Sequence, residues 1–68
     1  MVKIKIIWFD NSTSYVSEKG NATQFIECAK EYRTILTAKR IARIYLYNNL
    51  SIKDVIIIDE NNKEYYVF

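Results

Sequence analysis

The chain has 68 residues, of which 50% are hydrophobic and 26% are charged, and its formal net charge is +2. This length makes one domain over residues 1–68, and a domain this small buries only about 60% of the surface that its unfolded chain exposes. The apolar content excludes a disordered protein, and the mild charge excludes a strongly basic nucleic-acid coat. With one cysteine and no histidine, neither an internal disulfide nor a Cys/His zinc site can stabilise the fold.

No stretch of the chain approaches the roughly 20 apolar residues needed to cross a bilayer. The first residues, MVKIKIIWFDN, alternate lysine with apolar side chains and lack the continuous apolar core of a signal peptide. We therefore expect a cytoplasmic protein without membrane contact, in a reducing compartment where an unpaired thiol is common.

Residues 2–9 predict the first strand because their side chains alternate between two sides. One side is wholly apolar and is expected in the core: Val2, Ile4, Ile6 and Trp8. The other side begins charged and ends apolar. Polar residues 10–14 predict a turn, and residues 13–18 predict a returning strand that ends before Gly20, the only glycine. Together these segments predict a hairpin.

Two interpretations of residues 21–33 are open. The apolar residues of this segment have the i, i+3, i+4 and i+7 spacing of a helix: Phe25, Cys28, Ala29 and Tyr32. Asn21 suits the N-cap of such a helix, and Gln24 suits its capping-box position. The residues Phe25–Cys28 are also compatible with a third strand, because Phe and Ile favour strands. The sequence does not decide whether residues 22–33 are helix or strand.

Residues 34–49 give the strongest helix prediction, with Thr34 as N-cap and a pair of asparagines at the end. At about 100° per residue, six side chains share the arc expected to face the sheet: Ile35, Ala38, Ile41, Ala42, Tyr45 and Leu46. The opposite side mixes cations with apolar residues and is the predicted partner-binding surface: Leu36, Lys39, Arg40, Arg43, Ile44 and Tyr47.

The last two predicted strands, residues 55–58 and 64–68, form a hairpin about the sequence DENNK. Asn61 and Asn62 suit the left-handed backbone that a tight turn requires. Both faces of this hairpin are apolar, and no helix is expected over one of them. That apolar sheet face is assigned three residues: Ile56, Ile58 and Tyr66. Phe68 is expected to point to the same side as Tyr66.

Three arrangements would shield this apolar sheet face, and the sequence leaves all three open. A twisted sheet curls on itself beneath lysine stems and tyrosine rings. Alternatively, two copies pair as a homodimer through the face or a sheet edge, or a different protein covers it. Burying Ile56, Ile58 and one aromatic side chain across an interface is worth on the order of 5 kcal/mol, at about 1.5–3 kcal/mol per side chain.

The residue inventory argues against an enzyme. No histidine is present for proton transfer near neutral pH, and no Ser–His or Cys–His pair can activate a nucleophile. Cys28 is interpreted as a small buried hydrophobe. The adjacent carboxylates of Asp59 and Glu60 are interpreted as polar turn residues rather than as a metal site or an acid–base pair. We expect no catalytic residue, no metal and no cofactor.

We expect an α+β domain with an antiparallel sheet of four or five strands and one or two helices on one face. Its expected function is non-catalytic binding to another protein, as small accessory inhibitors of viruses and mobile elements do. The alternative is a nucleic-acid-binding regulator that uses the basic helix around Lys39 to Arg43. The abundant Ile, Lys, Asn and Tyr residues are those that AT-rich codons encode, which is common in bacteria and their viruses.

Overall fold

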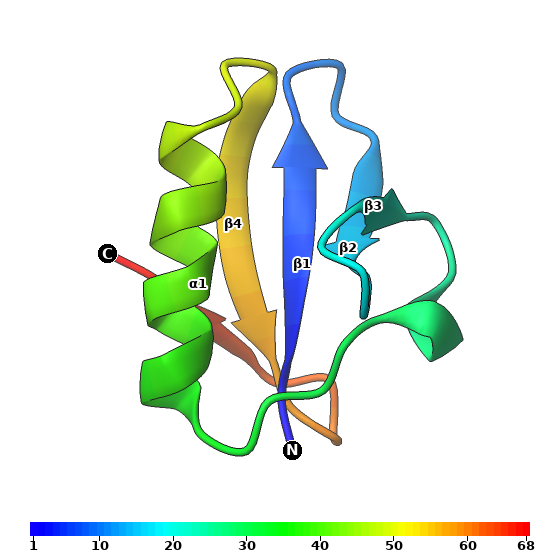
Figure 1. Ribbon diagram of the computed structural model, residues 1–68, viewed down its shortest axis with the longest axis vertical. Coiled ribbons are helices and arrows are strands. Elements are labelled where there is room, and N and C mark those ends of the chain that lie inside the picture. The colour runs from blue at the N-terminus through cyan, green and yellow to red at the C-terminus, as the bar shows by residue number, and fades with distance from the viewer.

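The computed structural model describes residues 1–68 as one antiparallel five-stranded sheet with one α-helix, so the predicted α+β fold is confirmed. The elements follow in chain order: β1 (Lys3–Trp8), β2 (Thr13–Val16), β3 (Ala22–Thr23), η1 (Ile26–Cys28, a 3₁₀ turn), α1 (Ile35–Tyr47), β4 (Ile52–Ile58) and β5 (Glu64–Tyr66). The spatial strand order is β3-β2-β1-β4-β5, which places β1 and β4 side by side. Figure 1 shows α1 lying along β4 on one side of the sheet.

The three hairpins share one turn geometry. In each, the residue before the turn donates its backbone N–H to the carbonyl four residues later and accepts the N–H of the third turn residue. That third residue has a left-handed backbone in every case: Asn11 (φ 68°), Gly20 (φ 84°) and Asn62 (φ 62°). Glycine and asparagine tolerate this conformation better than other residues do. The prediction for Asn62 is confirmed, whereas Asn61 does not have a positive φ.

The helix α1 begins and packs as its sequence predicts. The side-chain oxygen of Thr34 accepts the backbone N–H of Thr37 at 3.2 Å, which caps the first turn. Ala38 and Ala42 are fully buried in the core, so the helix approaches the sheet closely. The other residues of the predicted arc pack against the same core: Ile35, Ile41, Tyr45 and Leu46. Neither α1 nor η1 combines the length and the apolar character of a membrane span.

The core lies between α1 and the facing side of β1 and β4. In the β1–β4 register, Ile4 is opposite Ile57 and Ile6 is opposite Val55, and all four side chains are fully buried. Cross-strand apolar pairs of this kind are the main stabilising contacts of a sheet. This side of the sheet therefore provides most of the hydrophobic stabilisation.

The opposite side of the sheet has no α-helix, yet Ile56 and Ile58 are each only 6% exposed. Their β1 neighbours in the register are Lys5 and Lys3, whose aliphatic stems flank them. The ammonium group of Lys3 donates to the carbonyl oxygen of Ile26 at 3.2 Å, which ties η1 to this side. The chain thus covers its own second face with lysine stems and the segment around η1.

The segment of residues 21–33 is not a second helix, and Phe25–Cys28 is not a strand. It contains β3, which is two residues long, and η1, which is a single turn. Ala29 and Tyr32 then form isolated antiparallel bridges, Ala29 to Ser17 and Tyr32 to Val2. The helical spacing was misleading because backbone bonds to β-strand neighbours, which the local sequence does not reveal, hold this segment extended.

The two-sided burial of β4 predicts the effect of removing one methyl group from either face. Ile57→Val and Ile56→Val should each lower the free energy of unfolding by about 0.5–1.5 kcal/mol, because both side chains lose packing within one chain. Urea unfolding at several protein concentrations measures this. The control Ile44→Val, at an exposed helix position, should change stability by less than about 0.5 kcal/mol. If the loss of unfolding free energy caused by Ile56→Val depended on protein concentration, burial of Ile56 within one chain would be contradicted.

Candidate functional site

The candidate site is the side of α1 that faces away from the sheet, together with one residue after β5. We define the α1 outer surface as seven residues: Leu36, Lys39, Arg40, Arg43, Ile44, Tyr47 and Phe68. The first six are the residues that the helical spacing predicts for this side. Their positions follow from the helix, because the buried Ala38 and Ala42 fix the side of α1 that faces the sheet.

Large apolar side chains on the α1 outer surface remain exposed to solvent. Leu36 is 71% exposed, Tyr47 is 72% exposed and Phe68 is 70% exposed. The rings of Tyr47 and Phe68 lie edge to face with their centroids 6.5 Å apart. Single exposed apolar residues are normal on protein surfaces, but neighbouring ones on one face indicate a contact surface.

Contacts with Arg43 hold Phe68 against this surface. The guanidinium group of Arg43 donates to the carbonyl oxygen of Val67 at 3.1 Å and lies 5.6 Å from the centroid of the Phe68 ring. The side chain of Phe68 therefore lies against α1, and the prediction that placed it on the sheet face with Tyr66 is wrong. The local sequence could not show this, because the contact joins residues 24 positions apart.

The α1 outer surface carries three cations, and none of them forms an ion pair within the chain. The helix contains Lys39, Arg40 and Arg43 and no acidic residue. The two ion pairs of the structure join Lys5 to Glu64 and the amino group of Met1 to Glu60, away from α1. Exposed aromatic and arginine side chains are enriched among protein–protein contact residues.

The predicted apolar sheet face is not a surface in this structure. Ile56 and Ile58 are buried within the chain, and only Tyr66 is exposed. Because Tyr66 is opposite Ile56 in the β4–β5 register, its ring stands at the edge of the covered region. Of the three residues predicted for this face, only Tyr66 is therefore available for contact, and two residues of the covering segment, Phe25 and Ile26, are exposed as well.

Cys28 lies at the end of η1 and is exposed, so its interpretation as a buried hydrophobe is wrong. The interpretation placed Cys28 on an α-helix or a strand, and neither forms at this position. The structure contains no group of three or more His, Cys, Asp or Glu side chains that could hold a metal ion.

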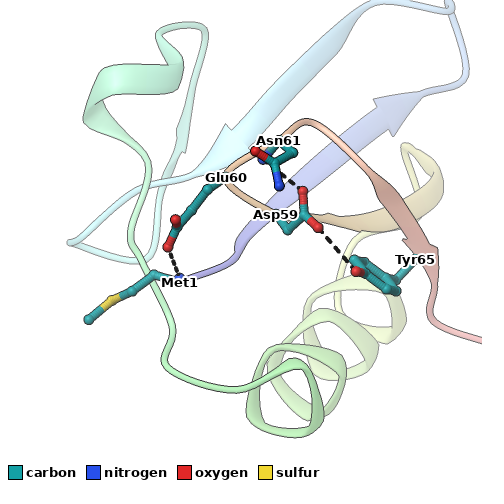
Figure 2. A network of polar contacts seen from close by, with 5 residues as sticks. All are labelled: Met1, Asp59, Glu60, Asn61 and Tyr65. Atoms are coloured by element: carbon teal, nitrogen blue, oxygen red, sulfur yellow. Dashed lines mark hydrogen bonds and ion pairs between the residues drawn. The ribbon is translucent and has the colours of Figure 1, made fainter.

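Asp59 and Glu60 point in different directions and serve the turn between β4 and β5 (Figure 2). One oxygen of Asp59 accepts the backbone N–H groups of Asn61 at 2.8 Å and Lys63 at 2.9 Å, and the other accepts the hydroxyl of Tyr65 at 3.0 Å. Glu60 instead forms an ion pair with the amino group of Met1. The two carboxylates therefore do not share a ligand or a proton.

These hydrogen bonds shift two pKa values in opposite directions. The bond from the Lys63 N–H, with smaller contributions from Asn61 and Tyr65, lowers the pKa of Asp59 below its ordinary 3.8. The bond to Asp59, together with partial desolvation, raises the pKa of Tyr65 above its ordinary 10.0. Both shifts favour the charged carboxylate and the neutral hydroxyl that the turn requires.

Comparisons with known proteins add no family to this geometry. The chain matches no protein-family model, no curated protein and no solved structure. Its function is therefore inferred from the residues and contacts described above.

The Asp59 turn predicts a specific dependence of stability on pH. The pKa of Asp59 is lower in the folded state than in the unfolded state. The carboxylate therefore stabilises the fold at pH values above its unfolded-state pKa, and this stabilisation is lost as the pH falls through its folded-state pKa. Asp59→Asn should therefore be less stable than the wild type at about pH 7, and the difference should narrow between about pH 5 and about pH 2. Thermal unfolding at a series of pH values measures it.

The control for this prediction is Tyr65→Phe, which removes one hydrogen bond to Asp59 and keeps the two backbone bonds. In a carboxylate NMR titration, the pKa of Asp59 should rise in this variant but stay below 3.8, because the largest cause of the shift remains. An unchanged difference between wild type and Asp59→Asn down to about pH 2 would contradict the assignment.

The contact between Arg43 and Val67 predicts different roles for two neighbouring arginines. Arg43→Ala should lower the free energy of unfolding by about 1–2 kcal/mol, because it removes a charged hydrogen bond and a cation–π contact. Arg40→Ala, with no such contact, should change it by less than about 0.5 kcal/mol. Urea unfolding measures both, and the NMR cross-peaks between the Tyr47 and Phe68 rings should weaken only in Arg43→Ala. Equal effects of the two substitutions would contradict this assignment.

Proposed function

We propose that the protein is a small non-catalytic binding protein that contacts another protein through the α1 outer surface. The observation that supports this most is the exposure of Leu36, Tyr47 and Phe68 on the outer side of α1, where Lys39 and Arg40 form no ion pair. The fold does not use these apolar side chains in its core. A partner that covers them removes apolar area from water, which favours association.

The exposed apolar residues of α1 share one side of the helix. Leu36, Ile44 and Tyr47 lie at positions i, i+8 and i+11, so they form one stripe along the helix. Burying these three side chains is worth about 5 kcal/mol or more, at about 1.5–3 kcal/mol each. Association costs about 4–15 kcal/mol, so a stable complex needs further contacts.

The charge of α1 specifies the chemistry of these further contacts. Lys39 flanks the apolar stripe, and Arg40 lies within it, between Leu36 and Ile44. An acidic protein surface with an apolar groove complements this arrangement, because opposite charges speed encounter and fix the orientation. In this proposal the protein works in the cytoplasm by occupying a surface of its partner, as accessory inhibitors of viruses and mobile elements do.

The second candidate function is nucleic-acid binding. It is supported by three cations on α1 without an acidic neighbour in the helix. Two observations favour the protein partner instead. The guanidinium group of Arg43 is already bound to Val67 and Phe68, and the aliphatic Leu36 and Ile44 have no counterpart in a phosphate backbone.

Affinity capture with matched variants tests the proposal. The tagged wild-type protein should retain a protein from cells that express it naturally, and the double variant Leu36→Ser, Tyr47→Ser should not, because it removes the apolar stripe. The control Phe25→Ser, Leu50→Ser changes two exposed apolar residues that do not belong to the α1 outer surface, and it should retain the same protein. In direct titration with that protein, the α1 variant should bind at least about tenfold more weakly.

Three outcomes would contradict the proposal. The first is that no captured protein distinguishes the α1 variant from the control. The second is that the wild-type protein retains DNA or RNA, and that this binding is lost at high salt and in the double variant Lys39→Ala, Arg40→Ala. That result would establish nucleic-acid binding, the second candidate function. The third is that light scattering shows a homodimer and that the substitutions Leu36→Ser and Tyr47→Ser dissociate it. A second copy of the chain would then be the partner that covers this surface.

A further inference from the structure

A separate hollow lies where the β1–β2 turn meets the loop between α1 and β4. Figure 1 shows these two connections side by side at one end of the sheet, and the backbone N–H of Phe9 donates to the carbonyl oxygen of Ser51 at 3.2 Å. The hollow has a volume of about 590 Å³ and eight lining residues: Trp8, Phe9, Asp10, Ser12, Ser14, Gln24, Leu50 and Ser51. None of them belongs to the α1 outer surface, so the inference below is independent of the proposed function.

The structure holds the aromatic wall of the hollow in place. The register between β1 and β4 shifts between Ile7 and Trp8, and such irregularities redirect the side chain that follows. The indole N–H of Trp8 donates to the hydroxyl oxygen of the buried Ser14 at 2.9 Å, which fixes the ring. Phe9 is exposed beside it and Leu50 is 93% exposed, so the hollow is open to solvent.

Polar groups without partners lie around these rings. One carboxylate oxygen of Asp10 accepts both the backbone N–H and the hydroxyl of Ser12, and the second oxygen has no hydrogen bond within the chain. The side chains of Gln24 and Ser51 line the same hollow, and no hydrogen bond within the chain involves them. A ligand in the hollow thus meets a free carboxylate oxygen, an amide and a hydroxyl.

The charge of the lining excludes several ligand classes. It contains one carboxylate and no cation, so phosphates, nucleotides and other anions are repelled. The hydrogen bonds that Asp10 accepts from Ser12 lower the pKa of this carboxyl group. Asp10 is therefore ionised at neutral pH and accepts hydrogen bonds. The lining suits a neutral molecule that has several hydroxyl donors and an apolar face for the rings.

We propose that this hollow binds a neutral carbohydrate, such as a short oligosaccharide. The C–H groups of a sugar ring pack against Trp8 and Phe9, because these slightly positive groups are attracted to the negative faces of aromatic rings. Asp10 accepts hydrogen bonds from sugar hydroxyls, and the amide of Gln24 both donates and accepts. The volume lies within the range of about 300–1,000 Å³ that is usual for ligand sites.

The single tryptophan of the chain makes this proposal directly measurable, because Trp8 lines the hollow. Maltotriose, cellotriose, mannotriose and chitotriose are titrated separately into the full chain while its fluorescence is recorded. At least one sugar should give a saturable change with a Kd of about 0.1–10 mM. Backbone NMR shifts for that sugar should be confined to the residues of the hollow.

Substitutions then assign the binding to the hollow. Gln24→Ala and Asp10→Asn should each weaken binding of that sugar by about 3- to 10-fold, because each loses hydrogen bonds to hydroxyl groups. The double variant Leu36→Ser, Tyr47→Ser should bind it as the wild type does. The proposal is overturned if no sugar gives a saturable change by fluorescence and NMR, or if NMR shows folded Gln24→Ala and Asp10→Asn variants binding like the wild type.

Discussion

The pairing of β1 with β4 is the interaction on which the rest of the structure depends. It brings an early strand beside a late one in the centre of the sheet and aligns Ile4 with Ile57 and Ile6 with Val55. Because β4 is apolar on both faces, this pairing creates two surfaces that water must not reach. The helix covers one of them. Lys3 and Lys5 cover much of the other, since the same register places their aliphatic stems beside Ile58 and Ile56. A chain this short thereby shields a two-sided strand with a single α-helix.

The elements that sequence predicts well are those whose own side chains determine their environment. The α1 segment has a cap, a continuous apolar arc and two alanines, and β1 has a clear alternation. The structure of residues 21–33 was not predictable, because the bridges from Ala29 to Ser17 and from Tyr32 to Val2 override the helical spacing of this segment. The candidate surface was predictable as far as α1 extends. Phe68 was missed, since its position depends on the contact between Arg43 and Val67, and the hollow was missed because three separate connections and strand ends build it.

The two candidate binding regions are positioned by different parts of the structure. The orientation of the α1 outer surface is set by Ala38 and Ala42, which are buried on the opposite side of the same helix. The hollow depends on the turn at Asn11, whose left-handed backbone closes the loop that contains Phe9 and Asp10. Cationic and apolar groups dominate the first, whereas hydroxyl, amide and carboxylate groups surround the rings of the second. The two regions share no residue.

The distance along the chain between β1 and β4 has a consequence for synthesis on the ribosome. The meander of β1, β2 and β3 emerges first, while β4 follows only after α1. At a translation rate of about 5–20 residues per second, one edge of β1 stays unpaired for a few seconds. Nascent chains with a bare strand edge are prone to aggregate, and lysines on such an edge oppose this. Lys3 and Lys5 are thus suited to two roles: they oppose aggregation of the nascent chain, and in the folded protein they cover Ile58 and Ile56.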